Sequence, residues 1–416
     1  MQHLGIFSVV RQVKQAIIFL MSKKTYIIIH GRQPAIGRAE IEAIYGADAV
    51  MPFSLESSIL KTDRKLRFDN LGGSIKALRV IRELKTDKWG AIEKEIGSHL
   101  NIRCAESESR LSYGISTYGK PRISGKAVAA SALRIKKSLK KSGRSVRMVP
   151  HSENPLNSAT VLHNKLTVGK GVEIVIVGDG KTTYLCETSH IQNVDAYAKR
   201  DHERPMRDAK VGMLPPKLAQ IIINLASQGS NQEDGEKRII LDPFCGTGVL
   251  LQEALLMGFG QYGTDIEPRM IEYTTGNLSW IASEVNKPVS LELEVADASK
   301  HTWTKPFDIV AGETYLGQPL SKLPPSDQLS KIMHEVNQLH HRFLGNIAKQ
   351  IPSGTRLCMA IPAWRGRKEF LHLTMLDYLD DLGYNRMSFE HSSNEDLIYH
   401  REDQVVAREL LVLIRK

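Results

Sequence analysis

Residues 238–267 read RIILDPFCGTGVLLQEALLMGFGQYGTDIE, and this stretch decides the fold of the chain. The mostly apolar run Arg238 to Leu241 predicts a short strand, and Asp242 to Gly248 predicts a glycine-containing turn. Val249 to Met257 predicts a buried helix, which Gly258 ends. A strand, a glycine turn and a helix in this order place unhindered backbone N–H groups and a helix N-terminus against a ligand. The stretch therefore predicts a ligand-binding α/β domain.

Two acidic residues indicate which ligand this turn would hold. A second predicted strand, Gln261 to Thr264, ends on Asp265, where a carboxylate can accept hydrogen bonds from ribose hydroxyls. The turn has fewer glycines than a dinucleotide fingerprint, and Asp242 stands at its start. This pattern favours S-adenosylmethionine over NAD, because Asp242 can approach the amino-acid end of that ligand and no pyrophosphate requires a third glycine.

The strand and helix pattern continues to the C-terminus. Further strands are predicted at Leu291–Ala296, Phe307–Gly312 and Arg356–Pro362, and a hairpin joins Leu397–His400 to Val405–Ile414. These elements predict a Rossmann-like class I methyltransferase domain over residues 213–416, with a mostly parallel sheet and an antiparallel C-terminal hairpin. Acidic residues stand at the carboxyl ends of four strands, where open α/β sheets bind ligands. They are Asp242, Asp265, Asp297 and Glu313.

Length and composition restrict the class of protein. The 416 residues predict two or three domains, and the formal net charge of +10 favours a polyanionic partner. The four cysteines are widely spaced, which disfavours a zinc site or a disulfide framework and favours a reducing cytoplasm. No apolar run approaches the ~18 residues of a membrane span. We therefore expect a cytoplasmic protein without a membrane segment or a metal, in which residues 1–22 are a tail or a misassigned extension.

The N-terminal half predicts two smaller domains. A strand at Lys24–His30 and helices at Ile36–Tyr45 and Leu71–Leu84 indicate an α+β, ferredoxin-like module over residues 23–100. A strand at Arg110–Tyr118 and a hairpin that joins Gly171–Gly178 to Thr183–Thr188 belong to a second domain, 101–195. Residues 196–212 then form a charged linker.

A basic helix is predicted between these strands, from Gly125 to Ser142. Residues 111–150 contain ten Lys or Arg and no Asp or Glu. A solvated helix face is the ordinary explanation of scattered lysines, but forty residues without a balancing acid favour binding to phosphates. The side chains expected to bind RNA are Arg134, Lys136, Lys137, Lys140, Lys141 and Arg144.

At this point the residues resemble a known family. DPFCGTG at 242–248 looks like motif I of methyltransferases that act on exocyclic amino groups. The chain from about Lys23 resembles the tRNA guanine-10 N2-methyltransferases, in the stretches YIIIHGRQPAIGRAEIEAIYG (26–46), LGGSIKALRVI (71–81), RLSYGISTYG (110–119), GVEIVIVGDGKT (171–182) and MLPPKLAQIIINLA (213–226). The resemblance implies a ferredoxin-like module, a THUMP RNA-binding domain and a methyltransferase domain, with S-adenosyl-L-methionine as cofactor and tRNA as partner.

The resemblance also implies roles for residues of the cofactor site. Asp242, Gly246 and Gly248 would surround the methionine end, Asp265 would bind the ribose, and Asp297 would bind the adenine amino group. Phe244, Ile266 and Ala298 are also expected in this site. The sequence does not indicate the modified nucleotide or an activating small subunit.

The catalytic motif departs from the family pattern. The family has Asp/Asn-Pro-Pro-Tyr after the fourth strand, and this chain has Glu313-Thr314-Tyr315-Leu316-Gly317. We expect Glu313 to accept hydrogen bonds from the methylated amino group and Tyr315 to stack on the base. Two alternatives stay open: a ribosomal-RNA guanine-N2 methyltransferase, and a non-catalytic RNA-binding protein with a degenerate methyltransferase domain. Cytosine C5 methylation is disfavoured, because Cys245 and Cys358 fit packing positions better than that of a nucleophile.

Overall fold

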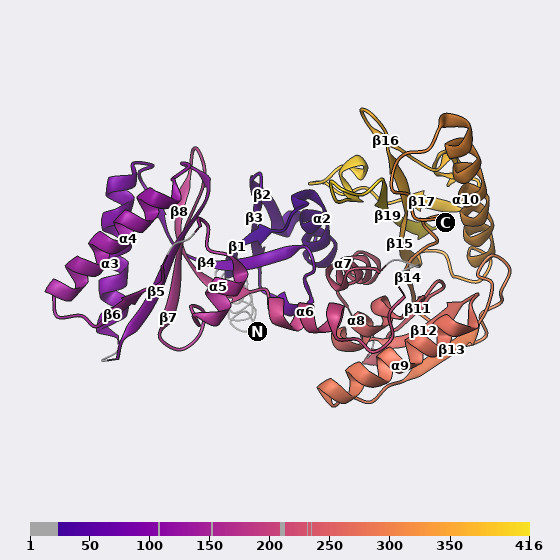
Figure 1. Cartoon of the computed structure of the whole chain (residues 1–416), viewed down its shortest axis with the longest axis horizontal. Helices are drawn as coiled ribbons and strands as arrows, with labels where there is room; N and C mark the ends of the chain where they lie inside the picture. The colour runs from indigo at the N-terminus through magenta and orange to yellow at the C-terminus, as the bar shows by residue number, and fades with distance from the viewer. Residues whose placement is uncertain (1–23, 107–108, 151–152, 209–212, 231, 234) are drawn as a thin grey trace, which may run out of the picture. The chain divides into compact units, whose positions relative to one another are not determined.

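The computed structural model describes residues 24–106, 109–150, 153–208, 213–230, 232–233 and 235–416 (Figure 1). The predicted tail, residues 1–22, and the end of the predicted linker, residues 209–212, lie outside the described residues. The chain forms two compact units. The first holds the described residues of Met1–Gly31, Asp48–Phe68 and Ser74–Asn193, and the second holds those of Arg32–Ala47, Asp69–Gly73 and Val194–Lys416.

The first unit is built on one eight-stranded sheet in the order β2-β3-β1-β4-β8-β7-β5-β6. Its strands are β1 (Lys24–His30), β2 (Val50–Ser54), β3 (Ser57–Thr62), β4 (Ser74–Leu84), β5 (Leu111–Lys120), β6 (Val146–Met148), β7 (Gly171–Asp179) and β8 (Thr183–Ile191). Its helices are α3 (Trp89–Ala105), α4 (Gly125–Lys141) and α5 (Ser158–His163). The predicted strand at 110–118 and the predicted hairpin are confirmed as β5 and as the antiparallel pair β7 and β8. The division into a module at 23–100 and a THUMP domain at 101–195 stays a prediction.

The prediction of a helix over Leu71 to Leu84 is wrong, because Ser74–Leu84 forms strand β4. This strand pairs with β1 on one side and β8 on the other, so its neighbours take its backbone hydrogen bonds. Ala77 and Leu78 are adjacent in sequence and both fully buried. The strand therefore lacks the apolar–polar alternation that identifies a half-buried strand.

The second unit contains a mostly parallel sheet in the order β13-β12-β11-β14-β15-β19-β17, with β16 paired to β15 and β18 to β19. The strands are β11 (Ile239–Asp242), β12 (Gly260–Asp265), β13 (Leu291–Val295), β14 (Ile309–Glu313), β15 (Arg356–Arg365), β16 (Phe370–Leu371), β17 (Tyr384–Arg386), β18 (Ile398–Tyr399) and β19 (Val406–Arg415). The strands β13, β12, β11, β14 and β15 are parallel to one another. Strand β19 is antiparallel to its neighbours β15 and β17. The predicted Rossmann-like fold with an antiparallel C-terminal pair is confirmed.

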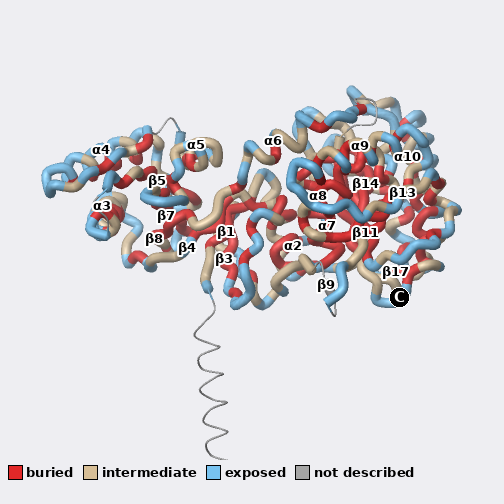
Figure 2. The backbone as a smooth tube through the Cα atoms, turned by 90° about the horizontal axis from the view of Figure 1, so that it is seen from below, coloured by how far each residue is buried: buried red, intermediate tan, exposed pale blue. Residues whose placement is uncertain are grey.

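Helices cover both faces of this sheet. Helices α7 (Pro216–Ser227), α8 (Val249–Met257) and α9 (Pro268–Val285) pack on one face, and α10 (Ser326–Ile347) packs on the other. Helices α2 (Pro34–Tyr45) and α6 (Val194–His202) pack against α7. Strands β9 (Gln232–Glu233) and β10 (Glu236–Lys237) form a separate pair. Successive strand residues serve opposite faces: Ile240 packs in the core of α7, α8 and α9, and Leu241 packs in the core of α10. The central strands are consequently buried on both faces, as a parallel sheet requires, and Figure 2 shows β11 and β14 within the buried red interior.

Helix α2 packs in the second unit although it follows β1 in the chain. Its Glu40 carboxylate is fully buried and accepts hydrogen bonds from Gly72 N, Gly73 N and the amide of Asn224 on α7, at 2.8–2.9 Å. Burial raises the pKa of Glu40 to about 7, against the opposing effect of these hydrogen bonds. The apolar residues Ile36 and Ala39 join the core of α7. This buried acceptor fixes the helix to the second unit.

Candidate functional site

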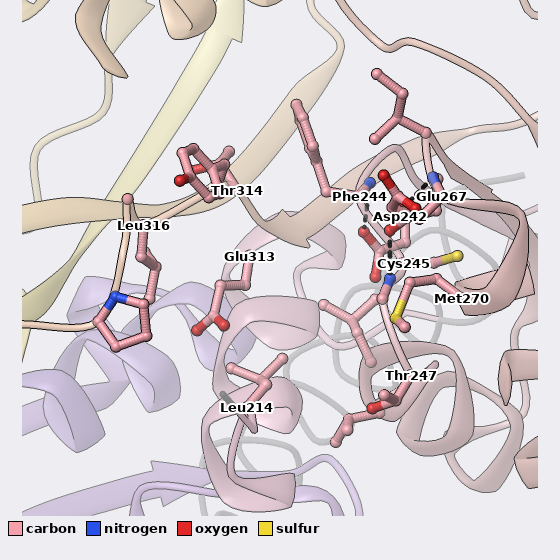
Figure 3. A pocket seen from close by; sticks show the side chains of 18 of the residues that line it. Leu214, Asp242, Phe244, Cys245, Thr247, Glu267, Met270, Glu313, Thr314 and Leu316 are labelled. Atoms are coloured by element: carbon pink, nitrogen blue, oxygen red, sulfur yellow. Dashed lines mark hydrogen bonds between the residues drawn. The ribbon is translucent and has the colours of Figure 1, made fainter. Parts of the chain in front are cut away.

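The candidate site is a cavity of about 480 Å³ in the second unit, at the carboxyl ends of β11, β12 and β14 (Figure 3). Figure 3 shows Asp242, Phe244 and Glu267 on one side of it, and Glu313, Thr314 and Leu316 on the other. Its volume is within the range of small-molecule and cofactor pockets. Seven of the ten residues predicted for the cofactor and catalytic sites line it, and they are Asp242, Phe244, Gly246, Asp265, Ile266, Glu313 and Tyr315.

The glycine turn requires glycine at two positions. Gly246 and Gly248 have φ angles of 51° and 81°, in the left-handed region that side chains other than glycine rarely adopt. A Cβ atom on Gly248 would lie 2.9 Å from the Oγ1 and Cγ2 atoms of Thr274 on α9. The turn therefore lets α9 approach closely and directs the chain into α8, which begins at Val249. Gly248 shapes the turn without lining the cavity itself.

Asp242 ends β11 and is buried beneath the turn, where its Oδ1 atom accepts a hydrogen bond from Phe244 N at 3.1 Å. Burial raises the pKa of Asp242 well above its usual range, and the charges of Asp265 and Glu313 raise it further. Gly312 on β14 lies against it, since a Cβ atom there would stand 2.6 Å from Asp242 Oδ1. A cationic group of a ligand would stabilise the ionised form of this carboxylate.

Asp265 ends β12 and organises the turn. Its Oδ2 atom accepts a hydrogen bond from Gly246 N at 2.9 Å, and its Oδ1 atom accepts one from Glu267 N at 3.0 Å. Burial raises its pKa, and these backbone donors oppose that effect. Ile266 beside it is 61% exposed although it lines the cavity, so it offers apolar surface to a ligand.

Asp297 and Ala298 do not line this cavity. Asp297 Oδ1 accepts hydrogen bonds from Ser299 N at 3.0 Å and Ser299 Oγ at 2.7 Å, and Lys300 lies 3.3 Å from Oδ2. The hydrogen bond from the Ser299 side chain is the main cause that lowers the pKa of Asp297. Asp297 nevertheless stays at the same edge of the sheet, because Ala296 N donates to the Asp265 carbonyl at 2.8 Å.

The altered motif, Glu313 to Gly317, is contacted by side chains from distant segments of the chain. Glu313 Oε1 accepts a hydrogen bond from Nε of Arg408 on β19 at 2.5 Å. The Thr314 hydroxyl lies 2.5 Å from Nε2 of His340 on α10, whose Nδ1 atom lies 2.7 Å from the Val336 carbonyl. Burial lowers the pKa of His340 to about 4, so the neutral ring donates from Nδ1 to the Val336 carbonyl. Its Nε2 atom faces the Thr314 hydroxyl, which also donates to the Ala360 carbonyl at 3.1 Å.

The two side chains that hold this motif, Arg408 and His340, were not predicted from the sequence. Arg408 lies 95 residues beyond Glu313 and pairs with it only because β19 returns beside β15. A local signal does exist: Arg408 and Glu409 are adjacent charged residues inside the apolar strand VARELLVLIR. Tyr315 is 49% exposed at the cavity, where its ring is accessible to a planar ligand.

The charge of the cavity limits its ligand. Four lining residues are acidic, namely Asp242, Asp265, Glu267 and Glu313, and none of the lining residues is Lys, Arg or His. This lining repels phosphate groups and attracts a ligand that carries positive charge. The same acids disfavour a thiolate: burial raises the pKa of Cys245 well above its usual range, and Asp242 and Asp265 raise it further. Burial likewise raises the pKa of Cys358 to about 12.

The predicted RNA-binding side chains differ in their contacts. The apolar face of α4, with Val128, Ala132, Ile135 and Leu139, is buried in the first unit. Lys137, Lys140 and Lys141 are exposed on the other face, and Lys136 is half-buried. Arg134 instead forms a forked pair with Glu93 on α3, from Nε to Oε1 at 2.8 Å and from Nη2 to Oε2 at 2.5 Å. Arg144 donates to Asn101 at 3.2 Å. Arg134 is therefore already paired with an acid.

The described part of the chain has neither a membrane-spanning helix nor a metal cluster. None of its helices is long and apolar enough to cross a membrane. Within it, no group of three or more His, Cys, Asp or Glu residues is arranged to hold a metal ion. The expected absence of a metal stays a prediction.

Comparison with known proteins supports the resemblance. Residues 204–377 match the family described as RMKL-like, methyltransferase domain. A tRNA (guanine(10)-N2)-dimethyltransferase of Methanothermobacter thermautotrophicus is 31% identical over 163 residues, which cover 39% of this chain and 42% of that protein. The protein of the same name from Pyrococcus abyssi is 30% identical over 150 residues, which cover 36% and 39%. The chain thus matches less than half the length of these curated relatives.

A solved structure extends the likeness of the fold. The crystal structure of TrmN from Thermus thermophilus superposes with a TM-score of 0.51 and 15% identity, over 94% of this chain and 100% of that one. At this identity the match concerns the fold alone. It confirms the fold class that the strand and helix pattern predicted. The family match confirms the resemblance to a methyltransferase domain over residues 204–377.

Proposed function

We propose that this protein transfers a methyl group from S-adenosylmethionine to the exocyclic N2 atom of a guanosine in tRNA, at a position of the guanine-10 type. The observation that carries this proposal is the cavity at the carboxyl edge of the sheet, with four acidic lining residues, no basic one, and a glycine turn at its base. The tRNA substrate is supported by the names of the relatives. The chain matches less than half the length of these relatives.

The residues present fit this cofactor. Its cationic sulfonium and ammonium groups suit an acidic cavity, and its ribose suits the carboxylate of Asp265 at the end of β12. Asp242, Gly246 and Gly248 would hold the methionine end, with Phe244 and Ile266 as apolar contacts. Asp297 and Ala298, one strand further along the edge, would contact the adenine. The bound cofactor supplies the electrophilic methyl group.

The acceptor side of the reaction falls to Glu313, Thr314 and Tyr315. An exocyclic amino nitrogen is a poor nucleophile, because its lone pair is delocalised into the ring. Hydrogen bonds that it donates to Glu313 and to the Thr314 carbonyl would concentrate electron density on it and align it with the methyl group. Tyr315, exposed at the cavity, would stack on a base extruded from its helix. As the methyl group moves from the sulfonium to the nitrogen, its bond to sulfur breaks and the nitrogen loses one proton, which Glu313 would receive.

The first unit would bind the RNA backbone. We propose that it contains the THUMP domain, residues 101–195, and most of the ferredoxin-like module, residues 23–100, although residues 32–47 and 69–73 pack with the second unit. Lys137, Lys140 and Lys141 on α4 would contact phosphates. We also propose a cytoplasmic location, because all four cysteines are free and buried.

A methylation assay with nucleoside mapping tests the function. The full chain is incubated with methyl-labelled S-adenosylmethionine and an unmodified tRNA transcript, and the digested nucleosides are identified by mass. We expect label in N2-methylated guanosine, and near-complete loss of label in Glu313→Ala with unchanged cofactor affinity. Label only in ribosomal RNA would instead favour the alternative substrate. A wild-type protein that binds cofactor and tRNA without transferring label would favour the non-catalytic alternative.

A further inference from the structure

Arg408 reaches Glu313 across the sheet. Glu313 on β14 stands beside Ala360 of β15, and Arg408 on β19 stands beside Pro362 of the same strand. The two side chains meet over β15, with Nε 2.5 Å from Oε1, and both are nearly buried, with side-chain exposures of 9% and 16%. Oε2 of Glu313 accepts no hydrogen bond from any described residue, and Arg408 does not line the cavity.

We propose that Arg408 is a positioning residue that keeps Glu313 ionised and directs its free Oε2 atom at the amino group to be methylated. This inference rests on the proposed function. It assigns Arg408 no contact with substrate or cofactor, since its whole effect passes through Glu313.

The charges around Glu313 show why such a residue is needed. Asp242 on β11 interacts electrostatically with Glu313, and Asp265 and Glu267 share the cavity with them. Carboxylates that face one another in a buried site resist ionising together. Among the described residues, Arg408 is the cation in contact with Glu313, so its charge would favour the ionised form of that carboxylate. A protonated Glu313 would offer a donor where the amino group needs an acceptor.

The neighbouring residue shows that this pairing is selective. Glu409 follows Arg408 on β19, and its side chain points to the opposite face. There it accepts from Arg386 at 2.7 Å and from His372 at 2.5 Å, so it does not compete for Arg408. The pairing also restrains Glu313, which has one more rotatable bond than the aspartate of the family motif.

Three variants separate positioning from general stability. Arg408→Met removes the charge, and Arg408→Lys keeps it. Arg386→Met removes a similar pair, between Arg386 on β17 and Glu409 on the opposite face of β19. The pH dependence of kcat/KM is measured for each with S-adenosylmethionine and an unmodified tRNA transcript. We expect the acid limb of the kcat/KM profile to lie about one pH unit or more higher in Arg408→Met than in the wild type. Below the limb, kcat/KM of the variant should then be lower by at least about tenfold, and above the limb it should partly recover. Arg408→Lys and Arg386→Met should keep the wild-type limb.

A second readout does not require turnover. The carboxyl ¹³C resonance of Glu313, assigned by its loss in Glu313→Gln, is titrated in the wild type and in the Arg408 variants. The inference is overturned if Glu313 titrates at the same pH in wild type and Arg408→Met, or if Arg386→Met moves the limb equally. A wild type without turnover at any pH would overturn the proposed function while the titration still decides the effect of Arg408. If Arg408→Met does not fold, Arg408→Gln is measured in the same way.

Discussion

At the scale of single residues, the local sequence predicts the acidic residues of the site. The side chains that contact Glu313 and Thr314 come from distant parts of the sequence. Asp242 and Asp265 were predicted to meet because parallel strands end at one edge of a sheet, and both line the cavity. Arg408 and His340 could not be predicted, because strand order and helix rotation decide their contacts with Glu313 and Thr314. The role of each predicted site residue stays a prediction.

Asp265→Ala should weaken binding of S-adenosylmethionine by about 1.5–3 kcal/mol, the range for a hydrogen bond to a charged group. The change also removes the acceptor of Gly246 N and Glu267 N, so the glycine turn should lose order. Calorimetric titration measures the affinity. Asp308→Ala is the matched control, since Asp308 accepts from Ile239 N at 2.7 Å at the start of β11, away from the cavity. Equal affinities of wild type and Asp265→Ala would contradict the assignment.

At the scale of elements, the clearest predictions came from elements with one buried face. Helix α4 has apolar residues at helical spacing on one side and basic residues on the other, and its bounds agree with the prediction within a residue. Strand β4 was predicted wrongly, because a central strand buries adjacent residues and its sequence then resembles a helix. Tertiary pairing with β1 and β8 overrides the local preference.

Replacing Lys136, Lys137, Lys140 and Lys141 of α4 with Glu should weaken tRNA binding and flatten its salt dependence. Loss of four phosphate contacts would reduce the slope of log K against log salt by up to about 3–4. Filter binding at several salt concentrations measures both quantities. Arg134→Ala should change them little, because Glu93 already occupies that guanidinium. Cofactor affinity should be unchanged, because α4 lies in the first unit and the cavity in the second. If the quadruple variant bound tRNA as the wild type does, the RNA would have to bind elsewhere.

At the scale of the whole molecule, the sequence predicted the sheet of the second unit but not everything packed on it. Strands β11, β14 and β15 are buried on both faces, and such strands give continuous apolar runs that are readily identified. The packing of α2 was not predicted, because its decisive feature is one buried carboxylate with partners near Gly72 and on α7. An acid on an otherwise amphipathic helix gives no local sign of where its partners lie.

The stability of the second unit should depend on pH through His340. Burial lowers its pKa from 6.5 to about 4, so the folded state binds fewer protons than the unfolded state between these values. The stabilisation is complete above pH 6.5 and is lost as the pH falls toward 4, by about 2 kcal/mol between pH 7 and pH 5. His340→Gln should remove this loss, although it also disturbs the contact with Thr314.

The matched control for this pH dependence is His372→Gln, which should act with the opposite sign. The hydrogen bond to Glu409 raises the pKa of His372, so its stabilisation is complete below pH 6.5 and is lost as the pH rises. Urea unfolding at pH 5 and pH 7, followed by tryptophan fluorescence, measures both, because Trp280, Trp303 and Trp364 all lie in the second unit. If wild type and His340→Gln lost equal stability on acidification, folding would not lower the pKa of His340, and the ring would be charged in the folded state at pH 5.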